Sequence, residues 1–169
     1  MRPSDYKYCP RCTARLKKRD KAFECPECGM TIYMNSAPTA AILIVRHDQV
    51  LLARRGDEPF KGQYDIVGGF LEYGEHPVAG VRREVQEETG LRVKVLDLLG
   101  VYMDTYGPRG KRTLNFYYVG SISSGRMRAK DDVAQLKWFP LDELPPLAFR
   151  SQAAAVRDLR KWVSEHAAT

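Results

Sequence analysis

Three carboxylates stand close together in one short stretch of the chain. Glu84, Glu87 and Glu88 occupy positions i, i+3 and i+4, so on a helix their side chains leave from one patch. Three negative charges so close together are unfavourable unless a cation lies among them. Carboxylate oxygens at this density suit Mg²⁺ or Mn²⁺, and such ions bridge phosphate oxygens. The stretch therefore indicates a metal site for a substrate that carries phosphate.

A solvated acidic helix face is the plain alternative, and it is the usual explanation for helices rich in Glu. Two neighbouring features favour the metal site. Gly68 and Gly69 allow a close approach of the backbone just before the helix. Arg83 stands among the acids, where its guanidinium can orient one of them.

A second set of metal ligands lies near the N-terminus. Cys9 and Cys12 form one C-x2-C pair, Cys25 and Cys28 form another, and 12 residues separate the pairs. Two such turns facing each other make a tetrahedral sulfur site for Zn²⁺. Disulfides or free thiols are the alternatives, and the absence of a secretory leader argues against disulfides. With four protein ligands the zinc is structural, and it stabilises a segment of about 30 residues that has too little core to fold alone.

Composition and charge are those of an ordinary globular protein with a basic N-terminal segment. The net charge is +6, and residues 1–34 hold eight Lys/Arg against four Asp/Glu. Such a segment attracts phosphate-rich ligands, including RNA, or is simply a solvated surface. The longest apolar run, residues 40–45, is far shorter than the roughly 20 residues that cross a bilayer. We therefore expect a cytoplasmic protein without a membrane partner.

The remaining pattern indicates the elements that position these residues. Residues 39–46 and 49–55 are predicted to form a hairpin, with further strands at residues 64–67, 91–102, 113–122 and 136–139. Val78, Val81 and Val85 mark the apolar face of a helix that Gly90 ends, and these valines would hold the carboxylates outward. A C-terminal helix follows Pro145-Pro146. The pattern predicts an α+β domain over residues 35–169, with a mixed sheet, behind a zinc ribbon at residues 1–34 and a linker at residues 33–38.

The residues from Gly69 to Leu91 match the spacing G-x5-E-x7-R-E-U-x-E-E-x-G-U at every specified position, where U is a large aliphatic residue. This stretch resembles the signature of the Nudix hydrolases, which cleave a nucleoside diphosphate linked to another group. The resemblance covers residues 38 to about 163 and implies a Nudix α/β/α sandwich. With the four-cysteine segment in front, the chain is most similar to the zinc-ribbon branch, which includes the NADH and FAD pyrophosphatases.

The resemblance also implies roles for individual residues. Glu84, Glu87 and Glu88 would bind Mg²⁺ or Mn²⁺ together with the backbone carbonyl of Gly68. Arg83 would hold Glu75 or a neighbouring carboxylate by a bidentate contact. A water molecule activated by the metals would attack one phosphorus. The general base is Glu87, Glu88 or an acid from a later loop, for which Asp132 is the candidate, with a solvated loop acid as its alternative.

Substrate contacts are predicted more coarsely. Arg54 and Arg55 end a strand and would contact a phosphate or remain surface charges, and Phe70 directly follows the Gly68-Gly69 turn, where it could stack on a base. The chain departs from the family at residues 62–69, where G-x-W-x-L-P-G-G is common and this sequence reads GQYDIVGG. The S-Q-P-W motif of NADH pyrophosphatases is absent, whereas the run around Leu141 to Pro145 is closer to the FAD- and ADP-ribose-type members.

These features predict a pyrophosphohydrolase that acts on a nucleotide of the ADP-ribose, FAD or NADH class and releases a mononucleotide. One rival is an RNA 5′-end hydrolase whose basic ribbon grips a cap or triphosphate. Another is a nucleic-acid-binding ribbon fused to a catalytically silent Nudix fold, against which the complete set of glutamates argues. Whether the ribbon covers the substrate or mediates a homodimer stays open.

Overall fold

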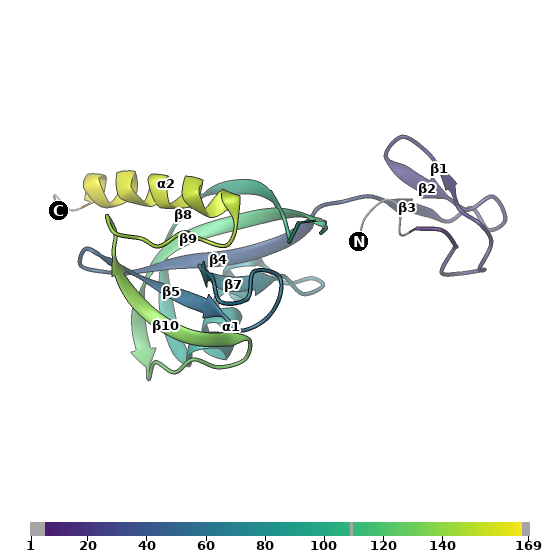
Figure 1. Ribbon diagram of the computed structural model, residues 1–169. Helices are drawn as coiled ribbons and strands as arrows, with labels where there is room; N and C mark the ends of the chain where they lie inside the picture. Colours follow the sequence, from purple (N-terminus) through teal and green to yellow (C-terminus); the bar gives the residue numbers. More distant parts are fainter. Residues whose placement is uncertain (1–5, 109, 167–169) are drawn as a thin grey trace.

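The N-terminal part of the chain forms a small sheet of its own. The structure is a computed structural model that describes residues 6–108 and 110–166. Strands β1 (Lys17–Lys18), β2 (Ala22–Glu24) and β3 (Thr31–Tyr33) make a three-stranded antiparallel sheet. Figure 1 shows this unit apart from the rest of the molecule, joined to it by one segment of chain. That segment is shorter than the predicted linker, because Tyr33 belongs to β3 and Pro38 to the next strand.

The second sheet is mixed and has seven strands. These are β4 (Ala37–Arg46), β5 (Gln49–Arg55), β6 (Tyr64–Asp65), β7 (Val67–Phe70), β8 (Leu91–Thr105), β9 (Arg112–Gly125) and β10 (Val133–Pro140). The order is β10-β5-β4-β9-β8, with β6 paired to β5 and β7 paired to β4. The predicted hairpin is confirmed by antiparallel pairing of β4 with β5, while β4 and β9 run parallel.

Several strands differ from the prediction in extent. The single strand expected at residues 64–67 is two short strands, β6 and β7, which pair with different neighbours. Strands β8, β9 and β10 are longer than expected. In β9 the polar residue Ser124 still pairs with Arg92, and Gly125 pairs with Leu91. Main-chain hydrogen bonds extend a strand without apolar side chains, so the hydrophobic pattern underestimates its length.

One helix covers each face of the large sheet. Helix α1 (Pro77–Thr89) buries Val81 and Val85 against one face, and the predicted stop at Gly90 is confirmed by its left-handed backbone, with φ at 69°. Helix α2 (Arg150–His166) buries Val156 and Leu159 against the other face. Burying each such side chain contributes roughly 1.5–3 kcal/mol. The predicted α/β/α sandwich is therefore confirmed, and Figure 1 shows its three layers.

Neither of the helices that the structure describes has the length and apolar character needed to span a membrane.

Candidate active site

A cavity of about 290 Å³ is lined by Glu84 and Glu88 of α1 and reaches Ser151 and Gln152 in the first turn of α2. Its wall includes residues from β4, β5 and β7, the segment before β10 and the helix pair. Of the residues singled out from the sequence, seven line it: Arg55, Gly68, Gly69, Phe70, Glu84, Glu88 and Asp132. Arg54, Glu75, Arg83 and Glu87 do not line the cavity.

The two glycines bring the backbone of β7 against the carboxylates of α1. Gly68 has φ at 144°, and a Cβ there would lie 2.3 Å from the carbonyl oxygen of Ala40. A Cβ at Gly69 would lie 2.5 Å from Oε1 of Glu84. The backbone N–H of Gly68 donates a hydrogen bond to Oε2 of Glu88 at 3.1 Å. Both positions therefore require glycine for the carboxylates to sit where they do.

Glu88 does not point outward as the valine pattern predicted. Its side chain turns into the cavity and is only 8% exposed. Burial foremost, and then the nearby charges of Asp132 and Glu84, raise the pKa of Glu88 to about 9. Burial also raises the pKa of Glu84. The prediction that Glu88 points outward was wrong. Glu88 lies next to the apolar face of the helix, and the absence of side chains at Gly68 and Gly69 leaves space for its carboxylate in the cavity.

Arg83 is the cation among these acids. Its Nε and Nη2 donate to the two oxygens of Glu75 at 2.8 and 2.9 Å, the bidentate contact expected from the sequence. Its Nη1 donates to Glu84 at 2.9 Å and to Glu87 at 3.0 Å. The hydrogen bonds from Arg83 lower the pKa of Glu75 to about 2. Arg83 therefore favours the ionised form of Glu75 and fixes the positions of Glu75, Glu84 and Glu87.

The donor set fits a hard divalent cation. Glu84, Glu88 and Asp132 line one partly buried site, where burial and the neighbouring negative charges raise the pKa values of Glu84 and Glu88, and a bound cation would relieve that repulsion. Within the described part of the chain, however, the four cysteines are the only group of three or more acids, cysteines or histidines with all ligand atoms within 4.8 Å of one another. Glu87 is half-exposed and paired with Arg83, so its side chain must change rotamer before Glu87 and Glu88 can bind the same ion.

The raised pKa of Glu88 makes a prediction for the metal-free protein. The ordinary value is 4.5 and the folded value is about 9, so the folded state binds this proton more tightly than the unfolded state. Stability is then fully present below the unfolded pKa and is lost as pH rises toward 9. We expect Glu88→Gln to flatten this loss, measured by urea unfolding from about pH 5 to 9 without Mg²⁺ or Mn²⁺. An unchanged slope in Glu88→Gln would contradict the burial argument, and Glu165→Gln on the exposed side of α2 is the matched control.

The far end of the cavity holds a buried polar network that the sequence did not reveal. Nη1 of Arg55 contacts Asp65 at 2.6 Å, and Gln152 donates to the other oxygen of Asp65. The hydroxyls of Tyr117 and Ser151 lie 3.0 Å apart and are buried. Asp65, Ser151 and Gln152 are missed by sequence reasoning because polar residues at strand and helix ends usually face solvent. Buried partners from distant segments cannot be read from local spacing.

Aromatic rings line the mouth of this end. Phe70 meets Tyr106 edge-on at a centroid distance of 5.1 Å, and Tyr106 stacks on Phe149 at 5.5 Å. Nζ of Lys111 lies 3.6 Å from the ring centre of Phe70. The two predicted arginines differ in placement: Arg55 lines the cavity, whereas Arg54 is exposed and donates to the carbonyl of Gly62. The cavity thus joins a carboxylate cluster at one end to an aromatic wall at the other.

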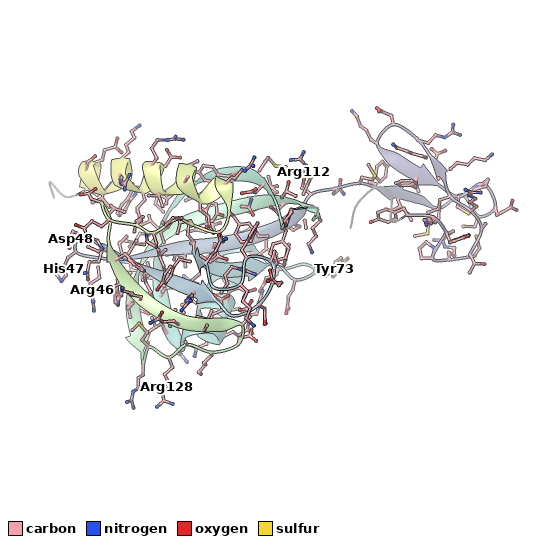
Figure 2. All side chains as sticks on the ribbon, in the orientation of Figure 1. Arg46, His47, Asp48, Tyr73, Arg112 and Arg128 are labelled. Carbon is pink, nitrogen blue, oxygen red and sulfur yellow. The ribbon has the colours of Figure 1, made fainter. Side chains whose placement is uncertain are left out.

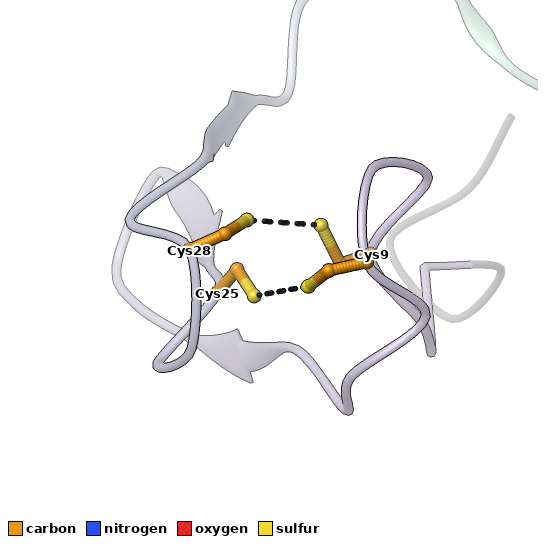
Figure 3. A group of neighbouring side chains, drawn as sticks. Cys9, Cys25 and Cys28 are labelled. Atoms are coloured by element: carbon orange, nitrogen blue, oxygen red, sulfur yellow. Dashed lines mark hydrogen bonds between the residues drawn. The ribbon is translucent and has the colours of Figure 1, made fainter.

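The four cysteines gather in the small sheet unit, as Figure 3 shows. Sγ of Cys9 lies 3.6 Å from that of Cys28, and Sγ of Cys12 lies 3.4 Å from that of Cys25. A disulfide would need about 2.05 Å, so the four are free thiols. Four ligands at about 2.3 Å from a central zinc would place the sulfurs roughly 3.8 Å apart. The spacing therefore fits a tetrahedral sulfur site.

Comparison with known proteins finds the same family across the chain. The NUDIX domain model matches residues 35–162. An ADP-ribose pyrophosphatase of Methanocaldococcus jannaschii is 36% identical over 149 residues, which cover 87% of this chain and 83% of that protein. The NAD-capped RNA hydrolase NudC of Pseudomonas aeruginosa is 33% identical over 156 residues, covering 90% of this chain but 55% of the relative. This chain therefore spans about half the length of the NudC relatives.

Solved structures agree with the fold. A NUDIX hydrolase from Nitrosomonas europaea superposes with a TM-score of 0.74 at 22% identity, over 95% of this chain and 92% of that one. A MutT NUDIX hydrolase from Burkholderia pseudomallei gives a TM-score of 0.68 at 28% identity, over 73% of this chain and 98% of that one. The first of these similarities includes the small N-terminal sheet unit in its coverage.

Proposed function

This chain belongs to the Nudix hydrolase family, and on that premise we propose that its cavity binds a nucleotide of the ADP-ribose, FAD or NADH class and that hydrolysis releases a mononucleotide. As a Nudix pyrophosphohydrolase it is an enzyme that splits the diphosphate of nucleoside diphosphate derivatives. The observation that carries the substrate proposal is the cavity itself. Glu84, Glu88, Phe70 and Tyr106 all line it, so a diphosphate beside the two carboxylates and a nucleoside against the two rings would share one cavity.

The carboxylates of α1 are proposed to hold the catalytic cation. Glu84, Glu87 and Glu88, with the backbone carbonyl of Gly68, would bind Mg²⁺ or Mn²⁺. When bound, such an ion lowers the pKa of water and neutralises charge on the phosphates. Gly68 keeps Glu88 in place through its N–H, and Arg83 keeps Glu75 and Glu84 in place. These contacts preorganise the oxygen donors before substrate arrives.

Asp132 is proposed as the general base, with Glu87 and Glu88 as the alternatives. It precedes β10 at the cavity wall, and its charge raises the pKa values of both Glu84 and Glu88, which indicates that it lies near them. A carboxylate there can accept a proton from a water molecule in the cavity.

The other end of the cavity is proposed to select the nucleoside. Phe70, with Tyr106 and Phe149, offers ring surface for a base. Arg55 uses three of its five N–H donors on Pro59, Asp65 and Tyr106, so two remain for a substrate phosphate. Arg54 lies outside the cavity, so it would contact a phosphate only in a substrate that extends beyond the cavity.

The N-terminal unit is proposed to be a structural zinc ribbon over residues 1–34, followed by a Nudix domain over residues 35–169. Support comes from the four free thiols within 4.8 Å of one another and from the shared core of Cys9, Leu16, Phe23 and Cys25. All four thiols would be ligands, so no coordination position is open for catalysis.

A substrate panel tests the proposed function. We expect mononucleotide release from ADP-ribose, FAD or NADH with Mg²⁺ or Mn²⁺, measured by chromatography beside nucleoside triphosphates and capped RNA. The Phe70→Ala variant should raise KM by about tenfold with a smaller change in kcat, because it removes ring contact worth about 1 kcal/mol or somewhat more. Hydrolysis of capped RNA alone would favour the rival 5′-end hydrolase, which the NudC relatives support.

A further inference from the structure

Asp104 is a carboxylate in the wall of the cavity, at the far end from α1. It lies near the end of β8, lines the cavity and is half-buried. Its Oδ2 accepts the backbone N–H of Ser151 at 2.6 Å, and its Oδ1 accepts the N–H of Thr105 at 2.7 Å. Ser151 belongs to the first turn of α2, so these contacts fix the carboxylate between β8 and α2.

Asp104 occupies the place where the start of α2 would attract an anion. Backbone N–H groups in the first turn of a helix have no partner within the helix and favour negative charge. Here a carboxylate of the protein itself accepts the N–H of Ser151. A phosphate of the substrate would have to displace Asp104 or lie beside its charge. The start of α2 therefore disfavours a phosphate in this part of the cavity.

The net charge at this end of the cavity is negative. In the part of the chain that the structure describes, Arg55 is the one cation that lines the cavity. Its guanidinium contacts Asp65 at 2.6 Å, and both side chains are largely buried, so these two charges balance. Asp104 adds a negative charge that no cation of the wall offsets. Burial, and then the charges of Asp65 and Asp104, raise the pKa of Tyr117 in the same wall.

Two further cations lie close along the chain but outside the cavity wall. Lys111 and Arg112 stand at the start of β9, where Arg112 pairs with Thr105, and neither lines the cavity. Nζ of Lys111 lies 3.6 Å from the ring centre of Phe70. Arg112 is exposed, and Figure 2 shows it at the outer surface of the body. Both cations therefore leave the charge of Asp104 uncancelled inside the cavity.

The neutral polar groups of the wall already use donors on one another. The hydroxyl of Thr39 donates to Asn115 at 2.6 Å, and the amide of Asn115 donates to the carbonyl of Tyr102 at 3.0 Å. One of the hydroxyls of Tyr117 and Ser151 donates to the other across 3.0 Å. A phosphate only accepts hydrogen bonds from such groups, whereas a sugar hydroxyl both donates and accepts. This part of the wall therefore suits hydroxyl groups better than a phosphate.

We propose that Asp104 makes the cavity select nucleotides whose ribose hydroxyls are free and reject nucleotides that carry a phosphate on the ribose. The inference rests on the proposed function, in which the nucleoside lies against Phe70 and Tyr106, two residues from Asp104. A carboxylate has about four acceptor positions, and two of them take backbone N–H groups, so two remain for ribose hydroxyls.

The same division of roles is known in dinucleotide sites. There an acidic side chain binds the ribose hydroxyl of NAD, whereas an Arg accommodates the 2′-phosphate of NADP. In this cavity the acid is Asp104, and Arg55 is already paired with Asp65. The proposal therefore narrows the substrate class to ADP-ribose, FAD and NADH, as distinct from nucleotides with a 2′-phosphate.

The selection is measured in the whole protein as the ratio of kcat/KM for ADP-ribose to kcat/KM for its 2′-phosphate, with Mg²⁺ or Mn²⁺. We expect the wild-type protein to favour ADP-ribose by about a hundredfold, because a carboxylate repels a phosphate dianion in a partly buried site. Asp104→Asn removes the charge but can still accept the N–H of Ser151. It should reduce the ratio by about tenfold, and any general loss of activity cancels in the ratio.

Asp97→Asn is the matched control on the same strand. Asp97 also accepts a neighbouring N–H, that of Leu98, and it accepts the indole N–H of Trp162 from α2. Unlike Asp104, it is exposed and does not line the cavity. We expect this variant to keep the wild-type ratio.

A binding measurement separates this inference from the proposed function. Calorimetric titration with AMP and with adenosine 2′,5′-bisphosphate, neither of which contains a diphosphate, should show tighter binding of AMP, and Asp104→Asn should reduce the difference. Equal kcat/KM for the two ADP-ribose substrates, an unchanged ratio in Asp104→Asn, or an equal change in Asp97→Asn would overturn the proposal. Equal affinities beside intact ADP-ribose hydrolysis would reject only this inference. Preference for AMP without any hydrolysis of ADP-ribose would reject the proposed function and support the selection by Asp104.

Discussion

Replacing Glu88 by Gln is expected to lower kcat by about three orders of magnitude, or about 4 kcal/mol of transition-state stabilisation, with the fold retained. The amide keeps the shape of the side chain but removes the negative charge that would bind the catalytic cation. It can still accept the N–H of Gly68, which now contacts Oε2 of Glu88 at 3.1 Å. Steady-state hydrolysis of ADP-ribose at saturating Mg²⁺ and Mn²⁺ measures the loss.

Glu87→Gln should cause a loss of similar size, although Glu87 is half-exposed and bound to Arg83 in this structure. The comparison of the two variants tests whether Glu87 leaves Arg83 during turnover. Glu165→Gln makes the same chemical change on exposed α2 and should retain full activity. Wild-type turnover in both Glu87→Gln and Glu88→Gln would show that the carboxylates of α1 do not take part in catalysis.

Loss of zinc is expected to unfold the ribbon while the seven-stranded sheet stays folded. The strands of the ribbon are two or three residues long, and its buried core is four residues, two of them cysteines. The metal must therefore supply most of the folding free energy, about 10 kcal/mol or more for a structural zinc site. We expect one zinc per chain by atomic emission and none in Cys25→Ser.

Trypsin digestion reports the unfolding directly. The sites at Lys17, Lys18, Arg19 and Lys21 lie within or between β1 and β2, so cleavage there should become fast when zinc is chelated or Cys25 is replaced. Thr31→Ser, an exposed change in β3, should retain both zinc and protection. A zinc-free ribbon that still resists trypsin would show that the thiols pack without a metal.

The chemistry of the α1 face was predictable because it is local. Helical periodicity places Glu84, Glu87 and Glu88 on one patch, and Gly90 directly after them marks the stop. The Arg83–Glu75 contact was expected from the family resemblance, because Glu75 lies before the helix. The cysteine pairs were predictable for the same reason. The hairpin of β4 and β5 followed from two apolar runs around a two-residue turn.

The second half of the cavity was not predictable because its members are distant in sequence. Asp65 meets Gln152 across 87 positions, and Tyr117 meets Ser151 across 34. Only the packing of α2 on the sheet brings them together, and nothing in the local pattern around Ser151 shows that its hydroxyl is buried. The inward turn of Glu88 escaped prediction similarly, since it depends on the glycines of β7.

The first turn of α2 forms part of the cavity wall, although in the sequence it lies about sixty residues after the Gly69–Leu91 stretch. A gene fragment ending before Arg150 would still contain every specified position of that stretch and would score as a complete hydrolase in a motif search. Its product would lack Ser151 and Gln152, which line the cavity, and Asp65 would lose the partner that Gln152 provides. Annotation of truncated or frame-shifted homologues by motif alone would therefore assign a complete substrate site to chains that lack part of its wall.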